Sequence, residues 1–422
     1  MSAAKAKPGY IRRFFSNLGP GLITGAADDD PSGIATYSIA GAQLGTSLLW
    51  TAFLTWPLMG VVQFMCARIG MVTGAGLGSA LRKKFPKPVL VIASLALLAA
   101  NTINIGADLA GMADAGEMLT GLNSHLLVIV FGSGIAFATI RFRYHQIADI
   151  LKWLALTLFA YVITAFLVKP DWSTVAHATF IPSWPSSHEA WGTLVAILGT
   201  TISPYLFFWQ ASQEVEEEKA MGRRMLVQRQ GATGKEIINR KLDVGVGTFF
   251  SNLVMYFIIL TTALTLNKHG ITQIETSKQA AEALRPLAGN FAALLYTAGV
   301  IGVGLLAIPT LSGSAAYAFA ETFHWKQGLD EKFTAAHSFY GVVILSTLAG
   351  IALDFANINP VKALFWTAVI NGCLAPFLLV GILLVASDSK IMKQQPSSKL
   401  SRIIVGLTTL FMFGAAIGLF VF

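Results

Sequence analysis

Charged side chains are scarce in this sequence. They make up 12% of its 422 residues, about half the share found in soluble globular domains. By contrast, 54% of the residues are hydrophobic and the mean hydropathy is +0.63. A chain of this composition has too little charge to cover a soluble surface, so we expect an integral membrane protein.

Cysteine is nearly absent as well. Cys66 and Cys373 both lie in apolar runs, which predicts small buried side chains and argues against a disulfide framework or a cysteine metal cluster. A secretory signal peptide is also missing, because the basic start MSAAKAKPGYIRRFFSN has no apolar core before a cleavage site. Residues 1–17 are therefore expected to form a cytoplasmic N-terminal segment.

Long apolar runs are what the sequence does contain. Each is close to the ~20 residues that a helix needs to cross a bilayer. They predict an all-α integral membrane protein with about 11 transmembrane helices in a single domain, residues 18–422. The predicted spans are 18–44, 47–73, 88–114, 126–141, 146–168, 190–213, 243–266, 289–322, 337–353, 361–386 and 403–422.

The basic residues set the expected orientation. With the N-terminus inside, 24 of the 30 Lys and Arg residues fall in cytoplasmic segments and 5 in external ones, as the positive-inside rule requires. We therefore expect a multi-pass protein of the plasma membrane, with its N-terminus cytoplasmic and its C-terminus outside. The net charge of +8 serves this orientation, so nucleic acid is not an expected partner. The charged segment 214–242 is expected to be a solvated cytoplasmic helix and turn.

Two of the predicted spans are interrupted. The first contains DDDPSG, where Pro31 lacks a backbone donor and Gly33 eases irregular geometry. The sixth contains GTTISPY, where Pro204 has the same effect. If 18–168 and 190–386 are two repeats, followed by one extra helix, the two breaks occupy matching positions. Such a pair of interrupted helices is typical of the midplane substrate site of a transporter.

The first interruption carries three consecutive carboxylates. Asp30 is adjacent to the break and best placed to reach an ion. Asp28 and Asp29 are expected to line the aqueous approach, or one of them to pair with a neighbour. An ionised carboxylate near the bilayer centre is costly and is kept for function. An acidic site indicates a cationic substrate, since a site for anionic substrates uses helix N-termini instead.

Three segments resemble a known family. GPGLITGAADDDPSGIATYSIAGAQLG resembles the first helix of the Nramp divalent-metal transporters, whose signature there is Asp-Pro-Gly-Asn. GTTISPYLFFWQAS resembles their sixth helix, with the signature Met-Pro-His, and ADLAGMADAGEML (107–119) resembles their third. The resemblance covers essentially the whole chain. It implies a LeuT-like fold, a 5+5 inverted repeat in which helices 1 and 6 are broken.

The resemblance also implies a metal site that differs here from the family pattern. The family's metal-binding Asp is kept as Asp30, its Asn falls on Gly33, and its Met falls on Ser203. A family glutamine falls on Leu374, and Asn371, one turn away, is expected to substitute for it. The implied ligands are therefore the carbonyls of Ala27 and Thr200 together with Asp30, Gly33, Ser203 and Asn371, beside the helix breaks at Pro31 and Pro204.

These departures change the metal that the resemblance implies. A Met thioether is a soft ligand suited to transition metals, whereas oxygen ligands suit Mg²⁺, Ca²⁺ and Mn²⁺. Losing the Met and Asn side chains enlarges the site, and Mg²⁺ commonly keeps several waters. The pattern is similar to the Nramp-related magnesium transporters, although that branch usually has Ala where this chain has Ser203. We expect Mg²⁺ as the substrate, with Mn²⁺ also accepted, and no cofactor.

The residues of the family's proton pathway are also replaced. Its third-helix Glu falls on Gly111, while the preceding Asp is kept as Asp108, and its sixth-helix His falls on Tyr205. The ninth-helix arginines are missing from AAHSFYGVVILSTLAGIA, which leaves His337 as the candidate substitute. Asp108 and Tyr205 are thus auxiliary residues, and uptake is expected not to be coupled to protons.

Two alternative functions stay open on the sequence. One is a proton-coupled Mn²⁺ or Fe²⁺ importer with an unusual proton path, and the other is a membrane sensor that binds ions without moving them. An enzyme is not expected, because the spans contain no set of nucleophile, base and orienting acid. The other histidines fall in loops or at span ends without metal-ligand spacing. The divalent ion and the lipid bilayer are the expected partners, with no obligate protein partner evident.

Overall fold

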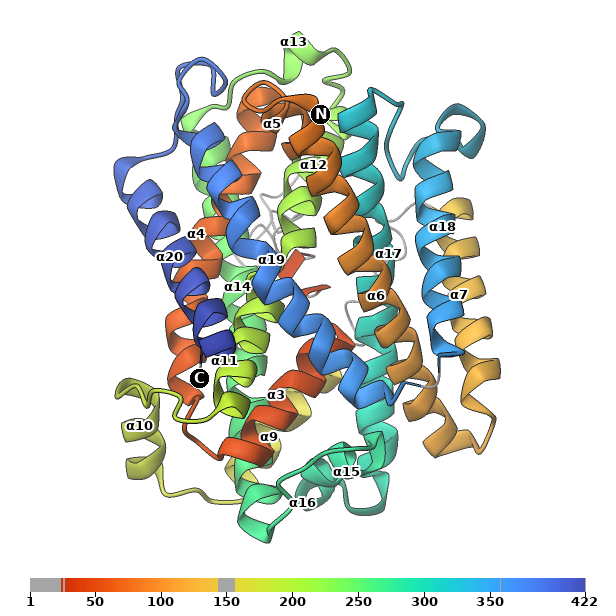
Figure 1. The fold of residues 1–422 in the computed structure, drawn as a ribbon, viewed down its shortest axis with the longest axis vertical. Helices are drawn as coiled ribbons and strands as arrows, with labels where there is room; N and C mark the ends of the chain where they lie inside the picture. Colours follow the sequence, from red (N-terminus) through yellow and green to blue (C-terminus); the bar gives the residue numbers. More distant parts are fainter. Residues whose placement is uncertain (1–23, 26, 143–155, 357, 422) are drawn as a thin grey trace, which may run out of the picture.

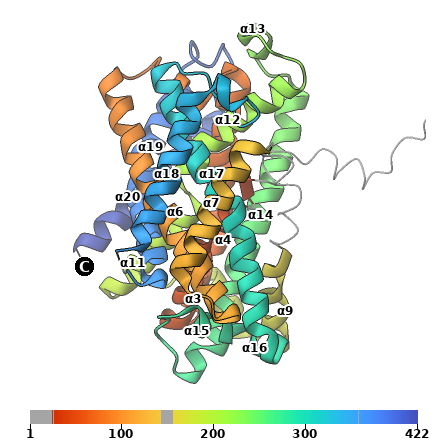
Figure 2. The same ribbon diagram turned by 90° about the vertical axis from the view of Figure 1, so that its right-hand side faces the viewer.

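A computed structural model describes residues 24, 25, 27–142, 156–356 and 358–421. These residues form helices joined by turns and loops, and no strand occurs among them. Figures 1 and 2 show the long helices packed together in one bundle, most of them running along its long direction. The all-α class predicted from the sequence is therefore confirmed.

Nine helices within the described residues are long and apolar enough to cross a membrane. Eight of them match one predicted span each: α4 (Leu49–Thr73), α6 (Lys87–Thr120), α7 (Ser124–Arg141), α14 (Gly234–Thr265), α17 (Ala292–Phe323), α18 (His337–Asp354), α19 (Pro360–Ser387) and α20 (Lys399–Val421). The ninth consists of α11 (His188–Thr201) and α12 (Pro204–Ala220). The first and fifth predicted spans lie partly outside the described residues and contribute α3 (Pro31–Leu44) and α9 (Phe159–Leu167).

Short helices connect the long ones. They are α5 (Leu77–Leu81), α10 (Trp172–Phe180), α13 (Leu226–Arg229), α15 (Ser277–Ala281) and α16 (Arg285–Ala288). Figure 1 shows α5 and α13 at one end of the bundle and α10, α15 and α16 at the other. Among the described residues, the short helices of predicted cytoplasmic segments and those of predicted external segments thus lie at opposite ends.

Glycines bring α11 and α19 into close contact beside the second helix break. A Cβ atom on Gly199 would lie 2.0 Å from the Ala368 carbonyl oxygen, and one on Gly372 would lie 2.3 Å from the Val195 carbonyl oxygen. Small residues allow membrane helices to approach in this way. The contact places α19 against the end of α11, which positions Asn371 near the break.

The prediction of buried cysteines is confirmed for Cys66 but not for Cys373. Both are free; Cys66 is buried in α4 and Cys373 is half-buried in α19.

At the α5 end of the bundle, Lys84 lies 2.9 Å from the carboxylate of Asp388, just beyond α19. This hydrogen bond holds the pKa of the Asp388 carboxyl below its usual value.

The prediction that residues 214–242 form a solvated helix and turn is wrong for the buried charged residues Glu214, Arg229 and Arg240. Arg240 on α14 is only 8% exposed. It binds three carboxylates, those of Glu214 at 2.7 Å, Glu217 and Asp243. Arg229, also buried, donates from Nε to the Gly74 carbonyl at 3.1 Å. Charge density in the sequence indicated solvent, but Arg240 pairs with these carboxylates inside the protein and so fastens α12 to α14.

Replacing Arg240 by methionine is expected to destabilise the protein by about 3–5 kcal/mol, because it leaves the buried Glu214 and Asp243 without their cation. Thermal unfolding in detergent measures the effect. Lys241→Met is the matched control, since Lys241 is the next residue of the same helix and is exposed. Equal melting temperatures for the two variants would show that the Arg240 cluster contributes nothing.

Candidate metal site at two helix breaks

The first helix break lies at Asp29 and Asp30. Residues 27 and 28 are helical, the next two are not, and α3 starts at Pro31. Proline is well suited to the first helical position because it has no N–H to leave unpaired. Asp30 caps α3, its Oδ1 accepting a hydrogen bond from the Gly33 N–H at 2.8 Å. The predicted break is confirmed, and the same side chain that is proposed to bind an ion also starts the helix.

The second break lies at Ile202 and Ser203, between the end of α11 and Pro204 at the start of α12. The Ser203 hydroxyl lies 2.6 Å from the Thr200 carbonyl oxygen and 2.9 Å from the Gly199 carbonyl oxygen. Ser203 therefore turns back onto the last turn of α11. Its hydroxyl oxygen keeps acceptor capacity that a cation can use.

The two breaks lie next to each other. Tyr205, in the first turn of α12, donates its hydroxyl to the Ala27 carbonyl at 3.1 Å, although the two residues are 178 positions apart in sequence. Ala27 and Tyr205 are both buried. The structure thus brings together two regions that the sequence analysis assigned to one site.

The carboxylate of Asp30 is buried and held by three donors. Oδ1 accepts from the Ser32 hydroxyl at 2.6 Å and from the Gly33 N–H, while Oδ2 accepts from Asn104 Nδ2 at 3.2 Å. Only 2% of Asp30 is exposed. Its side chain is therefore fixed in one orientation between α3 and α6.

Asn104 on α6 joins several predicted site residues, although the sequence analysis did not select it. Its Nδ2 also donates to Asp108 Oδ2 at 2.9 Å, and its Oδ1 accepts from Asn371 Nδ2 at 3.0 Å. Asn371 is thus linked to Asp30 through Asn104. Its spacing from Asp108 could have indicated this role, because Asn104 lies one turn before Asp108 and therefore on the same face of the helix.

Asp28 and Asp29 face α14. The Ser251 hydroxyl lies 2.7 Å from Asp28 Oδ2 and 3.2 Å from Asp29 Oδ1. Asp28 is fully buried and Asp29 is 5% exposed, so neither lines an open aqueous approach in this conformation.

Within the described ranges, the buried carboxylates of the site lack a cationic partner. Among the described residues, no Lys, Arg or His forms an ion pair with Asp28, Asp29, Asp30 or Asp108. A buried charge without such a partner is strongly unfavourable. The site is therefore chemically suited to a bound cation.

Oxygen atoms dominate the donors available to a metal ion. No group of three or more His, Cys, Asp and Glu side chains within the described ranges is arranged to hold a metal. What the breaks offer is the Asp30 carboxylate, the carbonyls of Ala27 and Thr200, the Ser203 hydroxyl and Asn371 Oδ1, which has no hydrogen-bond partner in the described part of the chain. Gly33 supplies no side chain. A set with one carboxylate and several neutral oxygens fits a hard cation that keeps part of its water shell.

Neither Gly111 nor His337 offers a proton-carrying group next to Asp30. A Cβ atom on Gly111 would lie 2.8 Å from Leu364 Cδ1, so an apolar side chain occupies the space next to it. His337 is exposed at the start of α18 and stacks edge-on against Phe333. It is not part of the buried network around Asp30.

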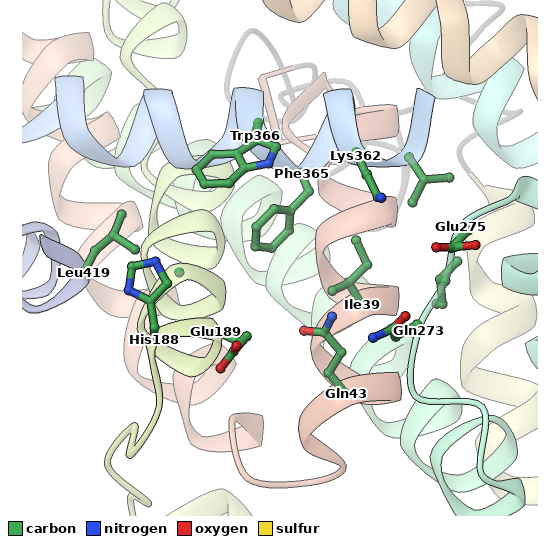
Figure 3. A pocket seen from close by; sticks show the side chains of 13 residues that line it. Ile39, Gln43, His188, Glu189, Gln273, Glu275, Lys362, Phe365, Trp366 and Leu419 are labelled. Atoms are coloured by element: carbon green, nitrogen blue, oxygen red, sulfur yellow. The ribbon is translucent and has the colours of Figure 1, made fainter. Parts of the chain in front are cut away.

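A cavity of about 310 Å³ lies between the ends of α3, α11 and α19. Figure 3 shows Gln43, His188, Glu189, Gln273, Glu275 and Lys362 around it. Gly192 also lines the cavity and is eight residues from Thr200 on α11, a distance of about 12 Å along the helix. The same three helices therefore line the cavity and carry candidate ligands of the buried site.

Fold and site together define a multi-pass membrane protein in which two interrupted helices meet at a buried acidic centre, the arrangement of secondary transporters. Residues 21–422 match the Nramp family, described as natural resistance-associated macrophage protein-like. The chain belongs to this family. It is a divalent-metal transporter of the Nramp type.

Two curated relatives cover most of the chain. The divalent metal cation transporter MntH of Caldanaerobacter subterraneus subsp. tengcongensis is 27% identical over 407 aligned positions, and the alignment covers 93% of this chain and 90% of that protein. MntH of Erwinia tasmaniensis is 26% identical over 348 aligned positions, and the alignment covers 79% of this chain and 78% of that protein.

Solved structures share the fold. The Eremococcus coleocola manganese transporter superposes with a TM-score of 0.74 at 16% identity, covering 98% of this chain and 88% of that one. MhsT in complex with L-phenylalanine gives a TM-score of 0.60 at 14% identity, covering 94% and 98%. At these identities the likeness concerns the fold, and it confirms the predicted LeuT-like architecture.

Proposed function

We propose that this transporter carries Mg²⁺, and also Mn²⁺, across the plasma membrane without coupling to protons. The ion binds where the two helix breaks meet. The observation that supports this proposal most is the buried Asp30 carboxylate, which lies at a break, accepts hydrogen bonds from neutral donors alone and has no ion-pair partner among the described residues.

The proposed preference for Mg²⁺ rests on ligand chemistry. Ser203 presents a hydroxyl where the family pattern has a thioether, and Gly33 presents no side chain where it has an amide. The remaining oxygen donors do not favour transition metals over hard cations. Mg²⁺ dehydrates reluctantly and is bound through one or two carboxylates while waters complete its octahedron. Asp30 supplies the carboxylate, and the carbonyls of Ala27 and Thr200 accept hydrogen bonds from such waters.

The proposed orientation and repeat structure follow the sequence analysis. The basic segments lie at the α5 and α13 end of the bundle (Figure 1), which we assign to the cytoplasm. The N-terminus is then cytoplasmic and the C-terminus external. The cavity of Figure 3 is the external entrance to the site. Residues 18–168 and 190–386 are the two repeats, and each contributes one helix break.

A proton-coupled Mn²⁺ or Fe²⁺ importer is the second candidate. The similar proteins favour it, since they are a manganese transporter and two divalent metal cation transporters named MntH. Asp108 would be its proton carrier, because it is buried, lies beside Asn104 and has no ion-pair partner among the described residues. A non-transporting sensor would bind Mg²⁺ but give no flux.

The double variant Ser203→Met with Gly33→Asn tests the ligand argument. It is expected to raise the ratio of Mn²⁺ to Mg²⁺ uptake by about tenfold or more, because it adds a soft thioether and a second side-chain ligand. A Cβ atom on Gly33 would lie 3.4 Å from Tyr37 and 3.6 Å from Asp30 Oδ1. These are ordinary van der Waals distances, so the Cβ of the new side chain fits without a clash. Competitive uptake into proteoliposomes measures the ratio.

The control for this experiment is Ser203→Leu with Gly33→Ala, which adds apolar atoms at the same positions but no ligand. It is expected to lower uptake of both ions without favouring Mn²⁺. An unchanged ratio in the Met and Asn variant, with uptake intact, would mean that these two positions do not set the preference.

A further inference from the structure

The two oxygens of the Asp30 carboxylate have unequal surroundings. Oδ1 accepts two short hydrogen bonds, from the Ser32 hydroxyl at 2.6 Å and from the Gly33 N–H at 2.8 Å. Oδ2 accepts a longer one, from Asn104 Nδ2 at 3.2 Å. Each carboxylate oxygen has about two acceptor positions. Both positions of Oδ1 are therefore taken, whereas Oδ2 has one left for a cation.

We propose that Ser32 restricts Asp30 to coordination through a single oxygen and so makes the site discriminate against Ca²⁺. This inference rests on the proposed function of the site as the binding place of a divalent ion. It assigns the selectivity to a side chain that does not touch the ion, because Ser32 acts through the oxygen that it occupies. Ser32 is thus a positioning residue.

The two ions differ in what they require of a carboxylate. Ca²⁺ takes six to eight oxygen ligands at about 2.3–2.6 Å and readily uses both oxygens of one carboxylate. Mg²⁺ requires an octahedron at about 2.0–2.1 Å, which one carboxylate oxygen and several waters satisfy. With Oδ1 occupied, Ca²⁺ loses a ligand that it would otherwise gain, whereas Mg²⁺ loses nothing.

The two donors to Oδ1 are not equivalent. The Gly33 N–H belongs to the backbone and caps α3, so it remains in any side-chain variant. The Ser32 hydroxyl is removable, and Ser32 is 1% exposed, so no bulk water is positioned to replace it. The variant Ser32→Ala therefore frees one acceptor position of Oδ1 while the helix start is preserved.

The experiment compares Ca²⁺ and Mn²⁺ uptake by the full-length protein in proteoliposomes, with Mn²⁺ as the reference ion in every variant. Ser32→Ala is expected to raise the ratio of Ca²⁺ to Mn²⁺ uptake by about tenfold or more, the effect of one hydrogen bond to a charged group. Ser32→Thr, which keeps the hydroxyl, is expected to retain the original ratio. Ser38→Ala is the matched control, because it removes another buried hydroxyl of α3.

Ser32→Gly also lacks the hydroxyl and serves if the alanine variant does not fold. Calorimetric titration of the purified variants with Ca²⁺ gives a second, flux-independent measurement. A Ca²⁺ to Mn²⁺ ratio that stays at the original value in Ser32→Ala or Ser32→Gly, with Mn²⁺ uptake intact, overturns the proposal and leaves the proposed function standing. Failure of the unmodified protein to transport Mg²⁺ overturns the proposed preference for Mg²⁺ instead. The role of Ser32 is still tested in that case, because the Ca²⁺ to Mn²⁺ ratio does not depend on Mg²⁺ transport.

Discussion

The Asp30→Ala variant is expected to lose divalent-cation uptake, with the apparent affinity falling by more than about 100-fold. Changes to residues that only support a metal ligand cost about 10–100-fold, and Asp30 is proposed to be the one charged ligand. Its removal leaves neutral oxygens, which cannot offset the dehydration of a divalent ion. Uptake of Mg²⁺ and Mn²⁺ into proteoliposomes measures the loss.

Asp30 also caps α3, so the charge must be separated from the fold. Asp30→Asn does this, because asparagine is as good a capping residue as aspartate and keeps the side-chain shape. It is expected to fold normally and to lose uptake as the alanine variant does. Asp171→Asn is the matched control, since Asp171 caps α10 by accepting from the Ser173 N–H at 3.0 Å. Normal uptake by Asp30→Asn would rule out Asp30 as the charged ligand.

The helix breaks were predictable because their causes are local. Pro31 and Pro204 lack the backbone donor that a continuous helix needs, and their neighbours in sequence decide the rest. The structure places both prolines at the first position of a new helix. The membrane spans were equally predictable from the apolar runs, since the bilayer fixes the length of a span.

The partners of the site were not predictable because they come from other helices. Asn104 and Ser251 lie 74 and 223 positions from the acidic residues that they contact, Asp30 and Asp28. A single polar residue in a membrane helix gives no sign of which neighbour it will face. Ser32 was overlooked for another reason. Its hydroxyl contacts a residue two positions away, which only the bent backbone of the break allows.

The charged segment 214–242 shows where composition misled the prediction. Dense charge normally marks solvent, and Glu216, Lys219 and Arg223 are indeed partly exposed. Arg240 and Glu214 are nevertheless buried, because they meet across two helices. A sequence records the charges but not their pairing, so the distinction between a solvated face and a buried ion pair appeared only in three dimensions.

Uptake is expected to proceed without proton movement. A divalent cation gains about 4.6 kcal/mol per 100 mV of inside-negative potential, twice the value for one charge, so no proton partner is needed. The neighbourhood of Gly111 is apolar, Tyr205 is bound to the Ala27 carbonyl, and His337 lies outside the network. Asp108 accepts a hydrogen bond from Asn104.

The central claim is therefore tested by loading proteoliposomes with a Mg²⁺ indicator and a pH indicator and imposing an inside-negative potential. The Asp30→Asn variant provides the background. The account predicts Mg²⁺ entry that increases with the potential while the internal pH stays at the background level. Absence of Mg²⁺ entry, together with Mn²⁺ entry that acidifies the interior, would contradict it and identify a proton-coupled manganese importer.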